Sequence, residues 1–387
     1  MSQRGVYRAK RCIDPMAIMV LIALLLPSMG GCESATEIVH KLLGSHMNDV
    51  AVQVAELPEK VSDAIVRGLD FSPDGKQLAE EWGGDHINIW DWKNQKIDHV
   101  LKKPYGGNDI GVSNPVHFSP DGRYFANCEQ SGEHDVVIRI WNATDWSIAK
   151  DIMASEEMAN KGVESRGGCT GMVFTPDAKM LIRTSDAGND GSNQLIVYSV
   201  GDWQAQWGLK WENFSPKSIA VSPDGTLAAV AGIVTTVPEN ARAPDAPLWL
   251  LKRDPTIFIV NLQQRKMVRT IQSLALGPMA WSLDGTRLAI VSGSVEIFDA
   301  HTGQKIMHDE IKSASSMNAR FTADGKYYIE ADSNYRGSGL GVKIWDAKRS
   351  KLFQHIALGD AGSIAVSRDS KYLAVGETGR TTIWQFK

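Results

Sequence analysis

Phe71-Ser72-Pro73-Asp74-Gly75-Lys76 is the stretch of sequence that decides the fold, because six related copies of it follow along the chain. The aspartates of the seven copies lie 47, 56, 47, 60, 40 and 45 residues apart. The later copies are Phe118-Ser119-Pro120-Asp121-Gly122-Arg123, Phe174-Thr175-Pro176-Asp177-Ala178-Lys179, Val221-Ser222-Pro223-Asp224-Gly225-Thr226, Trp281-Ser282-Leu283-Asp284-Gly285-Thr286, Phe321-Thr322-Ala323-Asp324-Gly325-Lys326 and Val366-Ser367-Arg368-Asp369-Ser370-Lys371. The chain therefore contains seven units of one kind.

The chemistry of the hexapeptide predicts a corner between two β-strands. A large apolar residue ends one strand, and proline fixes φ at the first corner of a tight turn. The aspartate side chain can accept a hydrogen bond from the backbone ahead of it, and glycine takes the positive φ that follows. A second apolar run begins at once, as at Leu78 and Tyr124-Phe125. Each copy should therefore join two antiparallel strands, a and b.

A third strand, c, marks every unit. Its copies are Ile87-Asn88-Ile89-Trp90-Asp91, Ile138-Arg139-Ile140-Trp141-Asn142, Leu195-Ile196-Val197-Tyr198-Ser199, Ile257-Phe258-Ile259-Val260-Asn261, Val295-Glu296-Ile297-Phe298-Asp299, Val342-Lys343-Ile344-Trp345-Asp346 and Thr382-Ile383-Trp384-Gln385. A fourth strand, d, follows in six units; examples are 96–101, 148–153, 267–271 and 352–356. Four short strands repeated every 40 to 60 residues predict the blades of a β-propeller.

The count of strands predicts how the ring closes. The seventh unit stops at Lys387, directly after strand c. Val50 to Val54 alternates β-branched residues and stands alone before the first unit. We expect it to supply the missing strand d, which removes an exposed edge. Residues 50–387 should therefore form an all-β, seven-bladed propeller closed by an N-terminal strand.

The units resemble the WD-repeat β-propeller family, in its bacterial form with Ser-Pro-Asp-Gly turns. The resemblance covers residues 50–387, and the Trp-Asp pair stands at Trp90-Asp91 and Trp345-Asp346, with Phe298-Asp299 as a softened copy. The Gly-His that opens a standard unit is missing throughout, so we expect the buried His-to-Asp network of that family to be absent. A closer relation to the repeats of TolB-like proteins stays open.

Residues 1–31 read as an export signal, followed by a short tether over residues 32–49. Positive residues precede the apolar run Met16 to Leu26, whose eleven residues cover about half of a ~30 Å hydrocarbon core. Pro27-Ser28-Met29-Gly30-Gly31-Cys32 resembles a bacterial lipobox, with Met29 where leucine is usual. The resemblance implies that Cys32 is lipidated and becomes the mature N-terminus. Ordinary signal cleavage beside a chance cysteine is the alternative.

The same resemblance implies a location. Glu33, not aspartate, follows Cys32, so the inner-membrane retention signal of enteric lipoproteins is absent. We expect a membrane-anchored lipoprotein that faces the periplasm, with the outer membrane favoured over the inner one. The net charge of −4 would become −7 without the leader, and an acidic domain with no basic stripe argues against a nucleic-acid partner.

Two cysteines fall within the predicted propeller, at positions 128 and 169. We expect Cys128 and Cys169 to be buried free thiols, since cysteine is common in protein cores. An exporting cell would also permit a bridge between them.

The predicted loops point to a binding surface. The a–b and c–d loops are short, whereas the b–c and d–a loops vary widely and emerge together on the other face. The largest is Ile233 to Pro255, whose four prolines predict neither helix nor ordinary strand. Loops on a rigid scaffold tend to carry recognition, although neutral drift also lengthens loops. The candidate interface residues, of the types that dominate binding energy, are Tyr105, His134, Trp249, Tyr335 and Arg336.

The sequence offers little for catalysis, metal binding or a cofactor. It holds no P-loop and no His-Glu-x-x-His motif, and its nine histidines are scattered. We therefore expect a non-enzymatic interaction scaffold in the bacterial cell envelope, with a protein or envelope component as partner. The alternatives are a propeller enzyme of the hydrolase or lactonase type and a sensor of a small ligand or glycan.

Overall fold

The structure is a computed structural model. It describes residues 49–58, 66–82, 84, 86–103, 116–128, 136–153, 169–185, 194–238, 251–291, 294–310, 315–333, 341–349, 351–359 and 361–387. Residues 51–387 belong to one compact unit. The leader, the lipobox with Cys32 and the tether up to residue 48 lie outside the described residues.

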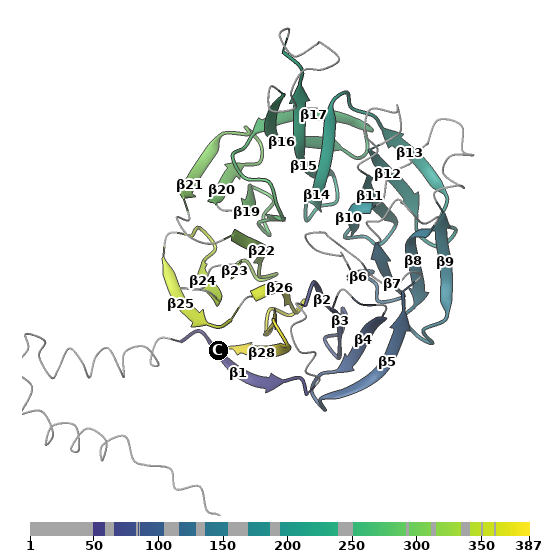
Figure 1. Ribbon diagram of the computed structural model, residues 1–387, viewed down its shortest axis with the longest axis vertical. Helices are drawn as coiled ribbons and strands as arrows, with labels where there is room; N and C mark the ends of the chain where they lie inside the picture. The colour runs from purple at the N-terminus through teal and green to yellow at the C-terminus, as the bar shows by residue number, and fades with distance from the viewer. Residues whose placement is uncertain are drawn as a thin grey trace, which may run out of the picture. The chain divides into compact units, whose positions relative to one another are not determined.

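Seven antiparallel four-stranded sheets are arranged as blades around a common axis (Figure 1). This confirms the predicted all-β, seven-bladed propeller. The inner strands a are β2 (Gly68–Phe71), β6 (Val116–Phe118), β10 (Cys169–Phe174), β14 (Phe214–Val221), β18 (Met279–Trp281), β22 (Ser315–Phe321) and β26 (Ala361–Val366). The strands b are β3 (Gln77–Glu81), β7 (Tyr124–Cys128), β11 (Met180–Ser185), β15 (Leu227–Thr236), β19 (Arg287–Val291), β23 (Tyr327–Ser333) and β27 (Tyr372–Glu377).

The outer half of each blade also follows the prediction. The strands c are β4 (His86–Asp91), β8 (Val136–Asn142), β12 (Leu195–Ser199), β16 (Lys252–Asn261), β20 (Ser294–Asp299), β24 (Gly341–Asp346) and β28 (Arg380–Phe386). The strands d are β5 (Lys96–Lys102), β9 (Ile148–Met153), β13 (Ala205–Leu209), β17 (Lys266–Gln272), β21 (Lys305–Glu310), β25 (Leu352–Ala357) and β1 (Ala51–Glu56).

The two ends of the propeller meet in blade 7. Its strand order is β1-β28-β27-β26, so the N-terminal strand pairs with the C-terminal one. The antiparallel register runs from Ala51 opposite Phe386 to Glu56 opposite Thr382. The predicted closure is therefore confirmed.

A repeated hydrogen-bond network forms each a–b turn. In the first turn, the Gly75 N–H donates to the Ser72 carbonyl (2.8 Å), and Gly75 has a φ of +68°. The Ser72 hydroxyl donates to Asp74 (2.7 Å) and accepts the N–H of Gln77 (2.9 Å). The Asp74 carboxylate accepts the N–H of Lys76 (3.1 Å). The hydroxyl at the second position of the hexapeptide, which the turn prediction did not use, is thus the centre of the network.

Hydrogen bonds within the turns hold six of the aspartates in their ionised form. Burial raises the pKa of Asp74, but the bonds from Ser72 and Lys76 outweigh it and leave that pKa below its ordinary value. Four other turn aspartates share this balance: Asp121, Asp177, Asp224 and Asp369. At the fifth turn, bonds from Ser282 and Thr286 lower the pKa of Asp284 to about 2.

The hydrophobic core lies between neighbouring blades. One cluster joins Leu78 and Trp90 of blade 1 to Ala374 and Ile383 of blade 7. The buried Trp90 indole donates to Glu80 on strand b of its own blade (2.7 Å). In blade 6 the indole of Trp345 likewise donates to Glu330 on strand b (3.1 Å). In these two blades a glutamate on strand b therefore accepts the hydrogen bond of the strand c tryptophan.

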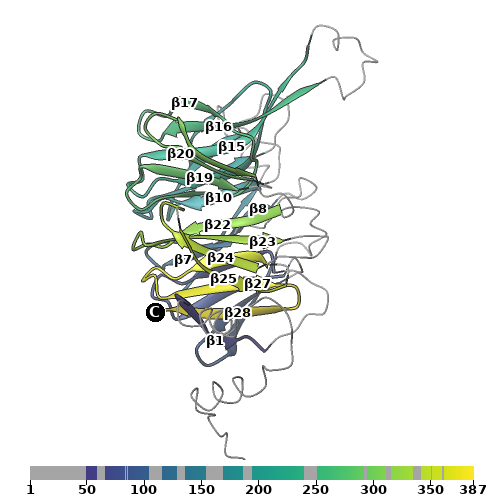
Figure 2. The same cartoon turned by 90° about the vertical axis from the view of Figure 1, so that its left-hand side faces the viewer.

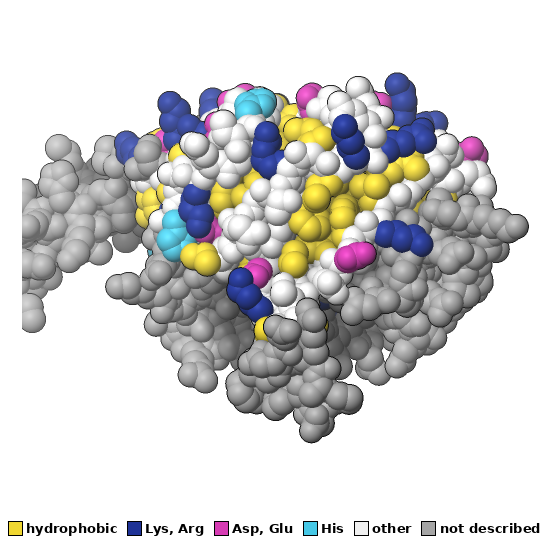
Figure 3. Space-filling view, turned by 90° about the horizontal axis from the view of Figure 1, so that it is seen from above, with side chains coloured by type: hydrophobic (Ala, Val, Ile, Leu, Met, Phe, Trp, Pro, Cys, Tyr) yellow, Lys and Arg dark blue, Asp and Glu magenta, His cyan; other side chains and the backbone are white. Residues whose placement is uncertain are grey.

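Charged side chains accompany the hydrophobic ones on the rim. The strands d each leave one edge unpaired, and exposed apolar residues such as Met267 and Ile306 lie on β17 and β21. Lysine and arginine side chains stand among hydrophobic ones on the side of the ring drawn edge-on in Figure 3. Such charges discourage pairing between the edges of different molecules.

The prediction for Ile233 to Pro255 was wrong at both ends of the segment. Strands β15 and β16 continue into this segment as a regular antiparallel pair. The pairing includes Ile233 opposite Pro255 and ends at Thr236 opposite Lys252. The pairing of β17 with β16 ends at Thr256, and beyond it the Pro255 carbonyl accepts the N–H of Ser273 (3.1 Å), so Pro255 lies at the end of the paired part of β16 on that side. A proline without an N–H is tolerated there. Residues 239–250, including Trp249, lie outside the described residues.

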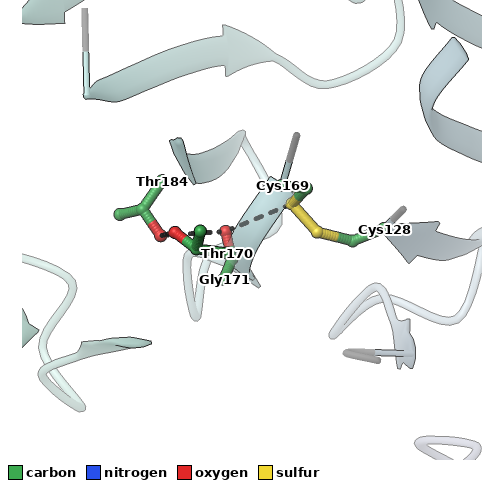
Figure 4. Close-up of a disulfide and its surroundings, with 5 residues drawn as sticks. All are labelled: Cys128, Cys169, Thr170, Gly171 and Thr184. Carbon is green, nitrogen blue, oxygen red and sulfur yellow. Dashed lines mark hydrogen bonds between the residues drawn. A yellow bond between two sulfur atoms is a disulfide. The ribbon is translucent and has the colours of Figure 1, made fainter. Parts of the chain in front are cut away.

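The prediction of free thiols was also wrong. Cys128 and Cys169 form a disulfide with a Cα–Cα distance of 5.7 Å (Figure 4). Cys128 ends β7 of blade 2 and Cys169 begins β10 of blade 3, and both are fully buried. The bridge therefore ties two neighbouring blades together in the core between them.

Candidate functional site

The candidate interface residues cannot be placed on the structure. Tyr105, His134, Trp249, Tyr335 and Arg336 all lie outside the described residues, as does the lipidation candidate Cys32. In sequence, these five interface residues fall between strands d and a or between strands b and c. Their common location therefore stays a prediction.

The a–b and c–d connections are short and the b–c and d–a connections vary in length, as the sequence predicts. Antiparallel pairing places the a–b and c–d connections at one end of the strands, called here the turn face. Coloured short turns follow this face along one side of the ring (Figure 2). All seven a–b connections have the length of 72–76, and the c–d connections are about as short, as at 92–95. The connections at the other strand ends range from 292–293 to 154–168 and 237–251.

The described inner strands surround a central channel. It has a volume of about 380 Å³. In blade 4, for example, the lining extends from Lys217, near the middle of β14, to Pro223 in the following turn. All seven inner strands or the residues flanking them contribute to it. Contacts between these strands give the order β2, β6, β10, β14, β18, β22, β26 and back to β2.

The residue directly before the turn hexapeptide forms the first layer of this lining. The large apolar residue at the first position, such as Phe71 or Phe118, is buried between blades. The residue just before it lines the channel in six blades, which gives the layer Asp70, His117, Val173, Ala220, Ala280 and Arg320. The sequence therefore did contain a signal for the channel lining. It is the position directly before each hexapeptide, where the residue varies from copy to copy.

This layer is divided into a charged half and an apolar half. Arg320 on β22, Asp70 on β2 and His117 on β6 belong to one sector, in which β26 lies between β22 and β2. Val173 and Ala220 lie in the remaining sector, on β10 and β14, together with Ala280 on β18. At the level of this layer, a ligand would therefore meet charge on one side and hydrocarbon on the other.

Asp70 links two blades within the charged half. Its carboxylate accepts the backbone N–H of Phe118 in blade 2 (2.8 Å). The same oxygen lies 3.7 Å from Nδ1 of His117. Asp70 is thus held in place by its neighbours, which suits a positioning role better than that of a free acid or base.

Arg320 is a partly buried charge on the wall of the channel. Its Nη1 donates to the side chain of Asn318 (2.6 Å) and to the carbonyl of Ala319 (2.9 Å). Burial lowers the pKa of the Arg320 guanidinium, and the negative charge of Asp70 opposes that shift. An arginine remains protonated at neutral pH, so the channel holds a partly buried positive charge.

A second layer lies two residues earlier on the inner strands. It consists of small or polar residues, namely Gly68, Gly171, Ser218, Pro278, Asn318 and Ser363. Arg67 and Lys217, one residue earlier again, add positive charge at that end of the lining. The small size of the residues in the second layer leaves the space in which a ligand could sit.

Two absences hold for the part of the chain that the structure describes. No group of three or more histidine, cysteine, aspartate or glutamate side chains there could hold a metal ion. Within the same residues, no helix has the length and apolar character to cross a membrane.

Comparison with known proteins gives a partial likeness. No family model matches the chain. A stretch of 86 residues, 21% of this chain, is 34% identical to Protein hir-1 of the fungus Neurospora crassa. The match covers 8% of that protein, so this chain spans only a small part of its curated relative. The architecture itself is that of a seven-bladed β-propeller.

Proposed function

We propose that this protein is an exported lipoprotein that acts as a protein-interaction scaffold in the bacterial cell envelope. The observation that carries the proposal is the contrast between the two ends of the strands. Every a–b connection has the same length, whereas the d–a and b–c connections reach the lengths of 154–168 and 237–251. Recognition is commonly carried by loops that a rigid scaffold positions.

The scaffold is rigid for several independent reasons. The ring is closed by the pairing of β1 with β28. The disulfide between Cys128 and Cys169 joins blades 2 and 3. In addition, the buried Glu296 of β20 accepts the N–H groups of Leu274 and Ala275, which follow blade 4. Loops attached to such a ring pay little entropy for the positioning of their ends.

The disulfide also supports export. Disulfides persist in oxidising compartments such as the bacterial periplasm and are rare in the cytosol. This agrees with the export signal expected over residues 1–31 and with a lipid anchor at Cys32. A lipidated N-terminal cysteine would hold the propeller at the membrane, with the outer membrane favoured by Glu33.

We propose binding rather than catalysis as the mode of action. The carboxylate of Asp70 serves as an acceptor for the backbone of the next blade, which is a structural task. The partner would be a protein or another envelope component on the long-loop face. Metal analysis of the purified protein tests the alternative of a hydrolase or lactonase, because stoichiometric calcium or zinc would favour it.

Site-specific photo-crosslinking tests the scaffold. A photo-crosslinking amino acid replaces Trp249 or Tyr335 in one set of variants, and Lys76 or Lys179 on the turn face in a control set. We expect the first set to capture one envelope component in cells and the control set to capture none. Capture of the same component from Lys76 and Lys179 alone would show that the turn face is the binding surface. Equal capture from both sets, or none, would also contradict the proposal.

A further inference from the structure

We propose that the central channel is a binding site for a small organic anion with a compact apolar body, and that Arg320 binds its anionic group. The inference does not depend on the lipid anchor or on the loop face. It follows from the hydrogen-bond state of Arg320, from the charges of the lining and from the division of the lining into two halves.

Arg320 retains donors for a ligand. Only its Nη1 makes hydrogen bonds among the described residues, to Asn318 and Ala319. No carboxylate of the described chain lies within ion-pair distance of it; Asp70 acts on it at longer range. Nε and Nη2 together form the edge with which arginine binds a carboxylate in bidentate fashion. A partly buried charge gains from such a partner, because the burial of a charge without one is costly.

The other charges of the lining favour an anion as well. Arg67, Lys217 and Arg320 line the described channel, against Asp70 as the acidic residue. The chain as a whole carries a net charge of −4, so the positive lining contrasts with the protein around it. Charge of one sign in a cavity with low-dielectric walls concentrates ligands of the opposite sign.

The shape of the channel limits the rest of the ligand. Its volume of about 380 Å³ is near the lower end for small-molecule sites. Val173, Ala220 and Ala280 line the half that faces the charged sector. A ligand whose carboxylate meets Arg320 would therefore place its body against hydrocarbon, which favours an apolar body over a sugar.

Benzoate is a suitable probe, because it combines a carboxylate with a compact apolar ring. Benzyl alcohol is its neutral counterpart, and inorganic phosphate is an anion without an apolar body. The protein is the mature chain with Cys32→Ser. Binding is followed by NMR of the His117 imidazole, which lies in the channel layer beside Asp70. We expect benzoate to shift this resonance in a saturable way, with benzyl alcohol and phosphate at least tenfold weaker.

Substitutions assign the binding to Arg320. Arg320→Gln should weaken benzoate binding roughly 10- to 100-fold, the range expected for charged hydrogen bonds. Arg253→Gln is the matched control, since Arg253 is exposed on β16 and does not line the channel; its affinity should stay within about twofold of the parent. If Arg320→Gln fails to fold, Lys217→Gln provides the test. Lys217 is exposed, so its substitution should weaken binding about threefold to fivefold.

Three results would overturn the proposal. The first is no shift of the His117 resonance at 20 mM benzoate. The second is equal binding of benzoate and benzyl alcohol, which would leave no role for the charge. The third is benzoate binding that neither Arg320→Gln nor Lys217→Gln weakens. None of these three results would bear on the scaffold function, because the crosslinking experiment tests the loop face alone.

Discussion

The side chain of Gln354 pairs with the backbone of Ala51, 303 residues earlier in the chain. The Ala51 N–H donates to Oε1 of Gln354 (2.8 Å), and Nε2 of Gln354 donates to the Ala51 carbonyl (3.0 Å). Gln354 lies on β25 of blade 6, whereas Ala51 begins β1 of blade 7. The closing strand is therefore held by a neighbouring blade as well as by β28.

Gln354→Ala should weaken the closure. Both hydrogen bonds are buried, so the loss leaves the N–H and carbonyl of Ala51 without these partners. We expect a loss of roughly 1–3 kcal/mol in the free energy of unfolding, measured by urea denaturation. Gln385→Ala on β28 is the control, because its side chain is exposed. An equal denaturation midpoint for Gln354→Ala and Gln385→Ala would contradict a role in closure.

Removal of the closing strand itself should cost more. Deletion of residues 50–56 takes away β1, exposes the edge of β28 and leaves blade 7 with three strands. We expect a sharply lower melting temperature in thermal unfolding followed by circular dichroism. A melting temperature equal to that of the full mature chain would refute this account of the ring.

The disulfide should contribute to stability. Its loop spans 41 residues, for which the chain-entropy estimate is roughly 4 kcal/mol. The Cys128→Ala, Cys169→Ala double variant should therefore unfold at clearly lower urea than the parent. In a Cys32→Ser background, a reductant should lower the midpoint of the parent and leave the double variant unchanged. Two free thiols in the denatured, unreduced parent would show that the bridge does not form.

Ala178 should be replaceable by glycine with a gain in stability. It has a φ of +56° at the position where Gly75 has +68°. A left-handed conformation costs a residue with a Cβ about 1–2 kcal/mol, whereas glycine adopts it freely. Ala178→Gly should raise the free energy of unfolding by about 0.5–1 kcal/mol, and Gly75→Ala should lower it by a similar amount. Nothing lies within 4 Å of a Cβ added at Gly75, so the second change tests conformation alone. The same sign for both variants would contradict this reasoning.

Glu296 should make stability depend on acid pH. Burial raises the pKa of Glu296, but bonds from Lys305, Ser273, and the N–H groups of Leu274 and Ala275 outweigh it, so its folded pKa lies below 4.5. The stabilisation is therefore fully present above the unfolded pKa and is lost as pH falls through the folded one. In urea unfolding between pH 6 and pH 3, Glu296→Gln should show a weaker loss of stability than the parent.

The control for this prediction is Glu212→Gln, since Glu212 is exposed. It should keep the pH dependence of the parent protein. His308 also faces Glu296, with Nδ1 at 3.4 Å, so His308→Gln serves as a second control that removes this contact. Parallel curves for Glu296→Gln and the parent would show that Glu296 does not carry the effect.

Cys32→Ser should release the protein from membranes. If Cys32 carries acyl chains, its loss removes about 0.8 kcal/mol of membrane affinity for every buried CH₂. We expect no incorporation of labelled fatty acid and recovery of the protein in the soluble fraction. Cys12→Ser, within the leader, is the control and should leave labelling intact. Persistent labelling of Cys32→Ser would reject the assignment of the lipid site.

The sequence alone determined the local units of this protein. Each turn is made by residues within one hexapeptide, for example Ser72, Asp74 and Gly75, so its signal is contained in the hexapeptide itself. The number of copies predicted the number of blades, and the missing strand after Lys387 predicted the role of β1. These inferences depend on interactions between residues close in the chain and on the number of repeated units. Both can be read from a sequence.

Only the tertiary structure decided how the blades meet. The pairing of Cys128 with Cys169, and of Gln354 with Ala51, depends on the distance and register between neighbouring sheets. The gathering of Arg320, Asp70 and His117 in one sector of the channel depends on the order of blades around the axis. No local pattern encodes these relationships, because each is set by packing between residues far apart in the chain.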